Sequence, residues 1–274
     1  MRVLLLYESC TGNTAYGVEV IRRVLSRDGH DCKVERFRDA EPSDLRGFDL
    51  YGFATPLNSF APLAPVWSFL KALPELSGKP AFIFTTGNGY AGVAHRLMAR
   101  RLRKHGLVVL GHHLMKSADN WPFSRNLTRF MDRLHPMKGE VKRTIRWTKE
   151  IAGKAEAVLA GAEVETPAYR LWPTPTLPLA LNAVYGGLKL ATGKRIIDPD
   201  ACTLCGRCAE VCPAGAVSMQ PGPAFSKACV GCWACFNVCP ENALRMGPKL
   251  ARPATQYRGM SSGKAERVLA KLGY

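Results

Sequence analysis

Residues 202–213 read CTLCGRCAEVCP, and residues 229–240 repeat the pattern as CVGCWACFNVCP. Each run places three cysteines at two-residue gaps, followed after three further residues by a fourth cysteine and a proline. This spacing is the ligand pattern with which bacterial proteins hold [4Fe–4S] clusters. The eight thiols of the two runs are enough for two such clusters, and a chain with two clusters is expected to move electrons.

In two-cluster proteins of this pattern, the fourth cysteine of each run ligates the cluster of the other run. The sequence therefore predicts a first cluster held by Cys202, Cys205, Cys208 and Cys239. It predicts a second cluster held by Cys229, Cys232, Cys235 and Cys212. The repeat extends beyond the cysteines, because Ala216 matches Ala243 and Met219 matches Met246 at the offset that relates the two runs.

Zinc sites and disulfides also use closely spaced cysteines. A zinc site needs only paired C-x-x-C units, so the third cysteine and the Cys-Pro of each run are surplus to it. Disulfides belong to oxidising compartments, and no signal peptide precedes the strand expected at Met1. The chain is therefore expected in the reducing cytoplasm, with zinc as the remaining alternative to iron–sulfur ligation.

The position of the cysteine runs divides the 274-residue chain. A segment of about 50 residues buries too little apolar surface to fold alone, so cluster binding is expected to replace a hydrophobic core there. Four parts are predicted: an α/β domain at 1–165, a Pro-rich apolar connecting arm at 166–196, a small α+β cluster domain at 197–248, and a tail with a short docking helix at 249–274.

Segment 1–165 alternates apolar runs with helical spacing. Strands are expected at 1–7, 32–37, 48–54, 80–85 and 106–111. Helices are expected at 15–27, 64–73, 91–104 and 140–160. Such alternation predicts a doubly wound parallel sheet of five strands, in the order 2-1-3-4-5, with helices on both faces.

The loop after the first strand is a candidate anion site. It reads Ser9-Cys10-Thr11-Gly12-Asn13-Thr14 and opens a helix, where unpaired N–H groups and the helix dipole attract negative charge. Its glycine allows the backbone to approach a phosphate closely. The loop has no lysine or arginine, and neutral donors suit a terminal monophosphate better than a polyphosphate with magnesium. An ordinary Ser/Thr capping turn is the alternative.

The chain is strongly basic, with a formal charge of +16 from 38 basic and 22 acidic residues. Such a surface favours acidic proteins, anionic substrates, anionic membranes or nucleic acid. Nucleic acid is not expected, because there is no basic tract with interleaved aromatics and no helix-turn-helix signal. The long uncharged stretches 50–70 and 171–188 contain three prolines each, which oppose a transmembrane helix. Peripheral membrane contact stays open.

The loop and the cysteine runs together resemble a known arrangement. The Ser-x-Thr-Gly-Asn-Thr run at 9–14 resembles the FMN-phosphate loop of flavodoxins. With the two four-iron motifs, the chain resembles the EFR1-type family of flavodoxin–ferredoxin fusion proteins. The resemblance also covers segments 55–58 and 86–90, after the third and fourth strands. Ordinary flavodoxins are acidic, so the identity of their partners does not carry over to this basic chain.

The resemblance implies that FMN lies across the carboxyl ends of the strands, where doubly wound sheets bind ligands. The implied FMN contacts are Ser9, Cys10, Thr11, Gly12, Asn13 and Thr14; Thr55, Pro56, Leu57 and Asn58; and Thr86, Gly87, Asn88, Gly89 and Tyr90. Many flavodoxins stack an aromatic side chain on the flavin ring. Tyr90, Phe60 and Trp121 are the candidates, with packing in the core as the plainer role for each.

Three functions are open on these observations. FMN takes one or two electrons and each cluster takes one, so the leading hypothesis is a flavo-iron–sulfur protein that exchanges electrons with an acidic redox protein. The alternative is a ferredoxin-dependent FMN reductase that acts on a small, anionic substrate. A nucleic-acid-binding or redox-sensing protein is supported by charge alone. No catalytic residues are indicated.

Overall fold

The computed structural model describes residues 1–58, 61–122, 135, 137–167, 195–246, 256–257, 259 and 262–274. These residues fall into two compact units. The first unit holds the described residues up to 117, those from 135 to 167, and 262–274. The second holds 118–122, 195–246, 256–257 and 259. Apart from its two ends, the connecting arm predicted at 166–196 lies outside the described residues.

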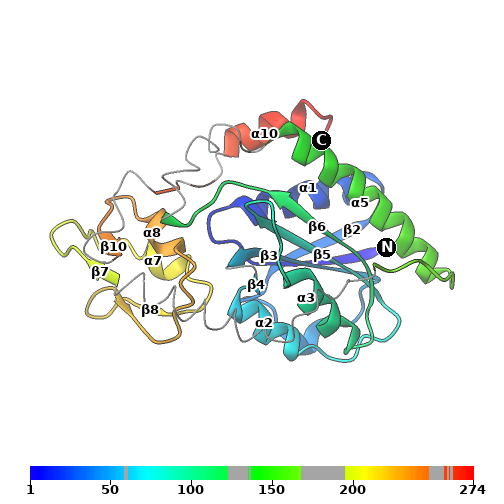
Figure 1. Ribbon diagram of the computed structural model, residues 1–274, viewed down its shortest axis with the longest axis horizontal. Coiled ribbons are helices and arrows are strands. Elements are labelled where there is room, and N and C mark those ends of the chain that lie inside the picture. The colour runs from blue at the N-terminus through cyan, green and yellow to red at the C-terminus, as the bar shows by residue number, and fades with distance from the viewer. Residues whose placement is uncertain are drawn as a thin grey trace. The chain divides into compact units, whose positions relative to one another are not determined.

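A parallel sheet forms the centre of the first unit (Figure 1). Its long strands lie in the order β2 (Asp31–Arg36), β1 (Arg2–Tyr7), β3 (Leu50–Asn58), β5 (Pro80–Gly87) and β6 (Val108–Lys116). In chain order this is the arrangement 2-1-3-4-5, so the predicted fold class is confirmed. The strand β1 lies between β2 and β3, and its residues Val3 to Leu6 are at most 2% exposed, which accounts for their continuous apolar run.

Helices cover both faces of the sheet (Figure 1). The helices α1 (Asn13–Arg27) and α5 (Lys138–Leu159) lie on one face, and α2 (Ala64–Lys71) and α3 (Ala94–Arg103) lie on the other. A short 3₁₀ turn spans Pro42–Asp44. No helix among the described residues is long and apolar enough to cross a membrane.

The strand β3 runs further than the sequence indicated. Segment 55–58 was expected to be a loop after a strand at 48–54, yet this segment ends the strand. Thr55 pairs with Thr85 on one side, and Leu57 pairs with Pro62 of the short strand β4 (Ala61–Pro62). The pairing of neighbouring residues therefore extends the strand past its expected end.

The helix α10 (Ser262–Ala270), near the end of the chain, belongs to the first unit. Its Leu269 is fully buried in the core that α1 and α5 share with the sheet. Glu266 forms an ion pair with Arg23 of α1 at 2.8 Å, and the hydroxyl of Tyr16 donates to the carbonyl of Ala265 at 3.5 Å. This helix therefore completes one side of the first unit.

The second unit is small and contains two antiparallel strand pairs. One pair joins β7 (Arg195–Ile197) to β10 (Leu244–Met246), and the other joins β8 (Val217–Ser218) to β9 (Ala224–Phe225). Two short helices, α7 (Arg207–Glu210) and α8 (Ala234–Val238), follow the cysteine loops. The core of this unit consists of Cys208, Trp233, Cys235, Phe236 and Leu244. This is the small α+β unit predicted from the cysteine runs.

Candidate functional site

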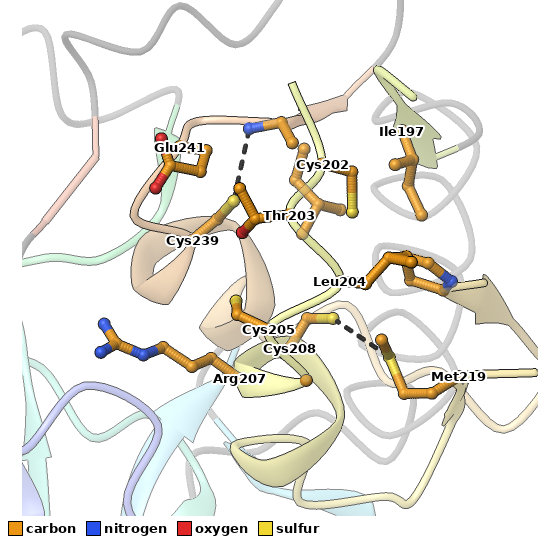
Figure 2. A pocket seen from close by; sticks show the side chains of 14 residues that line it. Ile197, Cys202, Thr203, Leu204, Cys205, Arg207, Cys208, Met219, Cys239 and Glu241 are labelled. Atoms are coloured by element: carbon orange, nitrogen blue, oxygen red, sulfur yellow. Dashed lines mark hydrogen bonds between the residues drawn. The ribbon is translucent and has the colours of Figure 1, made fainter. Parts of the chain in front are cut away.

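One cavity in the second unit is lined by four of the predicted ligand cysteines (Figure 2). They are Cys202, Cys205, Cys208 and Cys239. Most of the remaining wall is apolar and includes Ile197, Met219 and Leu244. The two charged residues that line it, Arg207 and Glu241, are both exposed.

A second cavity is lined by the other four cysteines. They are Cys212, Cys229, Cys232 and Cys235. Its wall also contains Arg195, Val217, Phe225 and Trp233. In both cavities the fourth cysteine of one run meets the first three of the other run, as the crossed ligand sets require.

Left-handed backbone turns shape the cysteine loops. The residue before each short helix has a positive φ, 74° at Gly206 before α7 and 63° at Trp233 before α8. Such a conformation is uncommon for a residue other than glycine, so the turn at Trp233 depends on the burial of its side chain, which is 4% exposed. The turns reverse the backbone between consecutive cysteines and allow the thiols to face a common centre.

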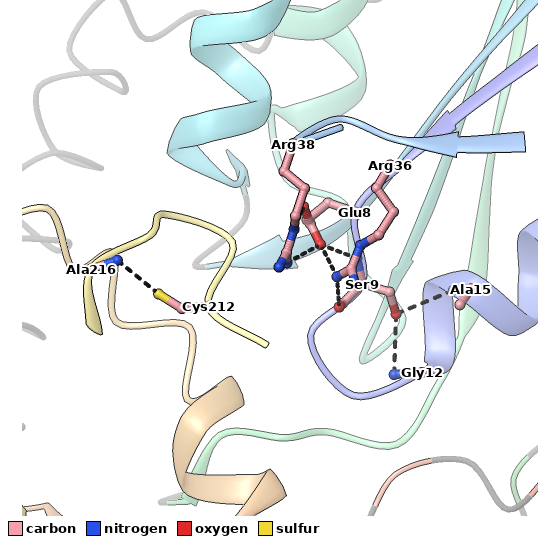
Figure 3. Close-up of polar contacts among 8 residues, drawn as sticks. All are labelled: Glu8, Ser9, Gly12, Ala15, Arg36, Arg38, Cys212 and Ala216. Atoms are coloured by element: carbon pink, nitrogen blue, oxygen red, sulfur yellow. Dashed lines mark hydrogen bonds and ion pairs between the residues drawn. The ribbon is translucent and has the colours of Figure 1, made fainter. Parts of the chain in front are cut away.

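The fourth cysteine of each run is held by the same contact. The N–H of Ala216 donates to the sulfur of Cys212 at 3.2 Å (Figure 3). The N–H of Ala243 donates to the sulfur of Cys239 at 3.3 Å. The two contacts occupy equivalent positions of the two runs, so the sequence repeat is also a structural repeat. N–H donors to these sulfurs hold the two side chains in position as ligands.

The thiols are suited to a group that carries positive charge. Burial raises the pKa of Cys208 and of Cys235, and the negative charge of neighbouring cysteines raises both further. Thiolates in such surroundings need the compensating charge of a metal. Among the described residues, no three His, Cys, Asp or Glu side chains are grouped closely enough to hold a single metal ion; the thiols are instead spread around the two cavities. This arrangement fits a cluster with four corners.

The loop at 9–14 enters α1 through Gly12, which has a φ of 86°. The hydroxyl oxygen of Ser9 accepts the N–H of Gly12 at 3.2 Å and that of Ala15 at 3.3 Å (Figure 3). Ser9 thus performs part of the capping role that was the alternative for this loop. A hydroxyl that accepts two hydrogen bonds can still donate its own hydrogen, so capping and phosphate binding are compatible here.

The strand register brings the three predicted contact segments to one edge of the sheet. Pro56 of β3 pairs with Thr86 of β5. The hydroxyls of Thr86 and Thr14 lie 2.8 Å apart, which joins the end of β5 to the start of α1. A Cβ atom on Gly87 would lie 3.1 Å from Cδ1 of Leu57, so the second and third segments approach closely. The carboxyl edge expected to hold FMN is therefore continuous.

The candidates for contact with the flavin ring differ in their surroundings. Tyr90 is 68% exposed, Asn88 is exposed and Asn58 is half-buried. Phe60 lies outside the described residues. Trp121 packs against the core of the second unit, which is the plainer role weighed for it.

A buried carboxylate beside the loop was missed by the sequence analysis (Figure 3). Glu8 is 1% exposed and accepts the N–H of Ser9 at 3.0 Å. Arg36 and Arg38 both pair with it, Arg38 at 2.9 Å, and Arg36 also donates to the carbonyl oxygen of Ser9. The group carries one net positive charge. The signal would have been one arginine at the end of β2 and another two residues later, combined with the strand order that places β2 beside β1.

A comparison with known protein families finds a match within the second unit. Residues 195–218 and 226–245 match the family of 4Fe–4S binding domains. This segment is a 4Fe–4S binding domain. Within this domain, sequence reasoning missed Arg195, which lies outside both cysteine runs and reaches the second cavity only because β7 pairs with β10.

The chain is also similar to solved flavodoxin structures. A flavodoxin from the domain Archaea is 22% identical over 57% of this chain and 99% of its own, with a TM-score of 0.45. A Megasphaera elsdenii flavodoxin is 26% identical over 41% of this chain and 84% of its own, with a TM-score of 0.39. Flavodoxin 2 from Bacillus cereus is 17% identical over 56% of this chain and 99% of its own, with a TM-score of 0.46. No curated protein matches the sequence.

Proposed function

We propose that this protein transfers electrons between FMN, two [4Fe–4S] clusters and an external redox protein. The observation that carries the proposal is the sorting of eight cysteines into two cavities, each with three thiols of one run and the fourth of the other. The 4Fe–4S binding domain lies in the same chain as a doubly wound sheet with an anion-binding loop. Each bound cluster would exchange single electrons, and FMN one or two.

The two cavities support the proposed ligand sets of the clusters. The first cluster is held by Cys202, Cys205, Cys208 and Cys239. The second cluster is held by Cys229, Cys232, Cys235 and Cys212.

The phosphate of FMN binds at the start of α1. The first N–H groups of a helix have no partner within the helix, and the positive φ of Gly12 turns the loop so that the backbone can approach a phosphate. Glu8 fixes the loop through the N–H of Ser9. Arg36 and Arg38 outweigh the charge of that carboxylate, so the surroundings of the loop favour an anion. The ring lies towards segments 55–58 and 86–90, with Tyr90 as its aromatic neighbour.

The external partner is an acidic protein of the reducing cytoplasm. Support for this comes from the formal charge of +16, because opposite charges steer two proteins together. Two exposed basic rows of the first unit are available for docking. The row of α3 consists of Arg100 and of Lys104 directly after the helix, and the row of α5 consists of Lys142, Arg146 and Lys149.

The composition of the purified protein tests the proposal. Protein purified without oxygen should contain about eight irons, about eight acid-labile sulfides and about one FMN per chain. Cys32 lies outside both cavities, so Cys32→Ala should keep the full iron content and serves as the control. Tightly bound zinc without acid-labile sulfide would refute the proposal. Steady-state formation of an organic product would favour the reductase instead.

A further inference from the structure

In the described part of the 4Fe–4S binding domain, the half-buried Arg195 has two buried guanidinium nitrogens without a hydrogen-bond partner. Arg195 begins β7, and its Nε and Nη2 atoms are shielded from solvent and make no hydrogen bond within the described part of the chain. A guanidinium is always charged and carries five N–H donors. Burying such donors unpaired costs free energy. The side chain therefore indicates an acceptor that must be supplied by a bound group.

The second cavity is the place where that acceptor would lie. Arg195 lines this cavity together with its four cysteines. Its Nη2 atom would lie 3.7 Å from a Cβ atom on Gly231, which stands between the ligands Cys229 and Cys232. The guanidinium is thus close to the sulfurs that would surround a cluster.

The first cavity has no equivalent group among its described lining residues. Its charged residues are Arg207 and Glu241, which are opposite in charge and exposed to solvent. At the offset that relates the two cysteine runs, Arg195 matches Gly222. In the second cavity, Arg195 is the one charged residue in the described wall apart from the thiols themselves. The two sites are therefore alike in ligands and different in charge.

We propose that Arg195 donates hydrogen bonds to the sulfurs of the second cluster and raises its reduction potential. Reduction adds one electron to the cluster; no bond breaks and no proton is taken up. The added negative charge is stabilised by a buried cation and by N–H donors to sulfur, both of which favour the reduced form. The exposed charges at the first cavity are screened by water and have less effect. An electron that enters the domain then resides preferentially on the second cluster. This inference rests on cluster binding as proposed above.

Redox titration of the intact protein, followed by electron paramagnetic resonance, tests the proposal. Arg195→Gln and Arg195→Met should lower one of the two cluster potentials. The expected change is about tenfold in the reduction equilibrium constant, which for one electron is about 59 mV. Arg195→Lys keeps the charge without the planar fork and should shift less. The affected potential should be the one that Cys212→Ala alters.

The matched control is Arg245→Gln. Arg245 lies in β10, which pairs with β7, and its side chain is 63% exposed in an ion pair with Asp198. Removing this charge should leave both potentials unchanged. If the Arg195 variants titrate like the unchanged protein, or if both clusters shift equally in them, the proposal is wrong.

A second measurement applies if the neutral variants lose the cluster. Protein labelled with ¹⁵N in its arginine guanidinium groups should show ¹⁵N coupling to the reduced second cluster in pulsed paramagnetic resonance. Arg195→Lys should abolish that coupling. Labelled protein with intact clusters and no coupling would overturn the proposal, whereas protein without iron or sulfide would instead refute the proposed function.

Discussion

At the scale of single residues, the two halves of the cluster domain are built by the same contact. Cys212 and Cys239 each accept an N–H from the alanine four residues on, at 3.2 and 3.3 Å. Each also precedes a proline, which has no N–H and a fixed φ. The local turn therefore carries the fourth thiol away from its own run and towards the other cavity.

This geometry predicts the result of Cys212→Ala. In this variant, the cluster held mainly by Cys229, Cys232 and Cys235 should be lost or should convert to a three-iron form. The other cluster should stay intact. Spectroscopy that resolves the two clusters, with iron analysis, measures the effect. Cys239→Ala is the mirror control and should damage only the cluster of the first run. Selective loss at the site of Cys202, Cys205 and Cys208 in the Cys212 variant would refute the crossed ligand sets.

Residue spacing made the cluster cavities predictable, because each ligand loop is local and its ligand set follows from the repeat. The group of Glu8, Arg36 and Arg38 was not predictable in this way. It joins the end of β1 to the end of β2 and the residues after it, about 30 positions apart in the chain, and no spacing rule connects them. The position of Arg195 was not predictable from spacing either, since only the pairing of β7 with β10 brings it to the second cavity.

At the scale of elements, the junction of β1 with α1 is the proposed site for the FMN phosphate. Gly12 has a φ of 86°, and Gly29, just past the end of the same helix, has a φ of 85° with open space where its Cβ would be. The two positions therefore impose similar backbone strain on a substituted residue, although only one adjoins the proposed phosphate site.

We expect Gly12→Val to abolish FMN binding and to leave both clusters in place. A β-branched side chain at this φ is strained, and it occupies the space that a phosphate needs. Gly29→Val imposes the same strain and should retain FMN. Flavin and iron contents of both purified variants decide the matter. Normal flavin content in Gly12→Val would contradict the assignment of the loop.

The packing of α3 on the sheet creates a buried histidine that resists protonation. His95 is 7% exposed, and its Nε2 lies 2.7 Å from the hydroxyl of Thr85. Burial, with the nearby His112 and His113, lowers the pKa of His95 from 6.5 to about 3. Between pH 6.5 and about pH 3, the histidine is protonated in the unfolded chain and neutral in the folded chain. The stability contributed by neutral His95 is therefore present above pH 6.5 and is lost as the pH falls below it.

His95→Gln keeps a polar group near Thr85 and cannot titrate. At about pH 5 the unchanged protein should have lost about 2 kcal/mol of the folding stability that neutral His95 contributes. The stability gap between the two proteins should therefore narrow by about that amount between about pH 7.5 and about pH 5. Denaturant midpoints measured without oxygen, at equal cluster content, test this. Parallel pH profiles of the two proteins would show that His95 does not contribute.

The sheet order was predictable because buried parallel strands are continuous apolar runs separated by amphipathic helices. The ends of the strands were less so. Thr55 to Asn58 were expected in a loop, and pairing with β5 and β4 holds them in a strand. The hydrogen bond between Thr14 and Thr86 likewise joins elements far apart in sequence. Local pattern therefore located the elements, and contacts between elements fixed where they end.

At the scale of the whole molecule, the positive charge predicts which surfaces take part in association with a redox partner. The basic rows of α3 and α5 lie on opposite faces of the first sheet (Figure 1). A docking protein that uses one row therefore leaves the other exposed. Reversal of the charges of one row should affect association far more than reversal of the other.

Stopped-flow electron exchange with an acidic low-potential ferredoxin, across a salt series, tests this expectation. The second-order rate constant should fall with salt, because ions screen charges beyond about 8 Å at physiological ionic strength. Steering of this kind raises association rates by roughly ten- to a thousand-fold. Arg100→Glu with Lys104→Glu should be compared with Lys142→Glu, Arg146→Glu and Lys149→Glu. If the rate constant stays the same across the salt series and in both charge-reversed variants, electrostatic steering through these rows is excluded.

The place of α10 affects the order in which the protein can be made. Its Leu269 fills the core of the first unit, although the whole cluster domain is translated before it. A ribosome therefore releases the second unit while the face that receives α10 is still uncovered. The first unit can therefore complete its core only after the whole cluster domain has been translated.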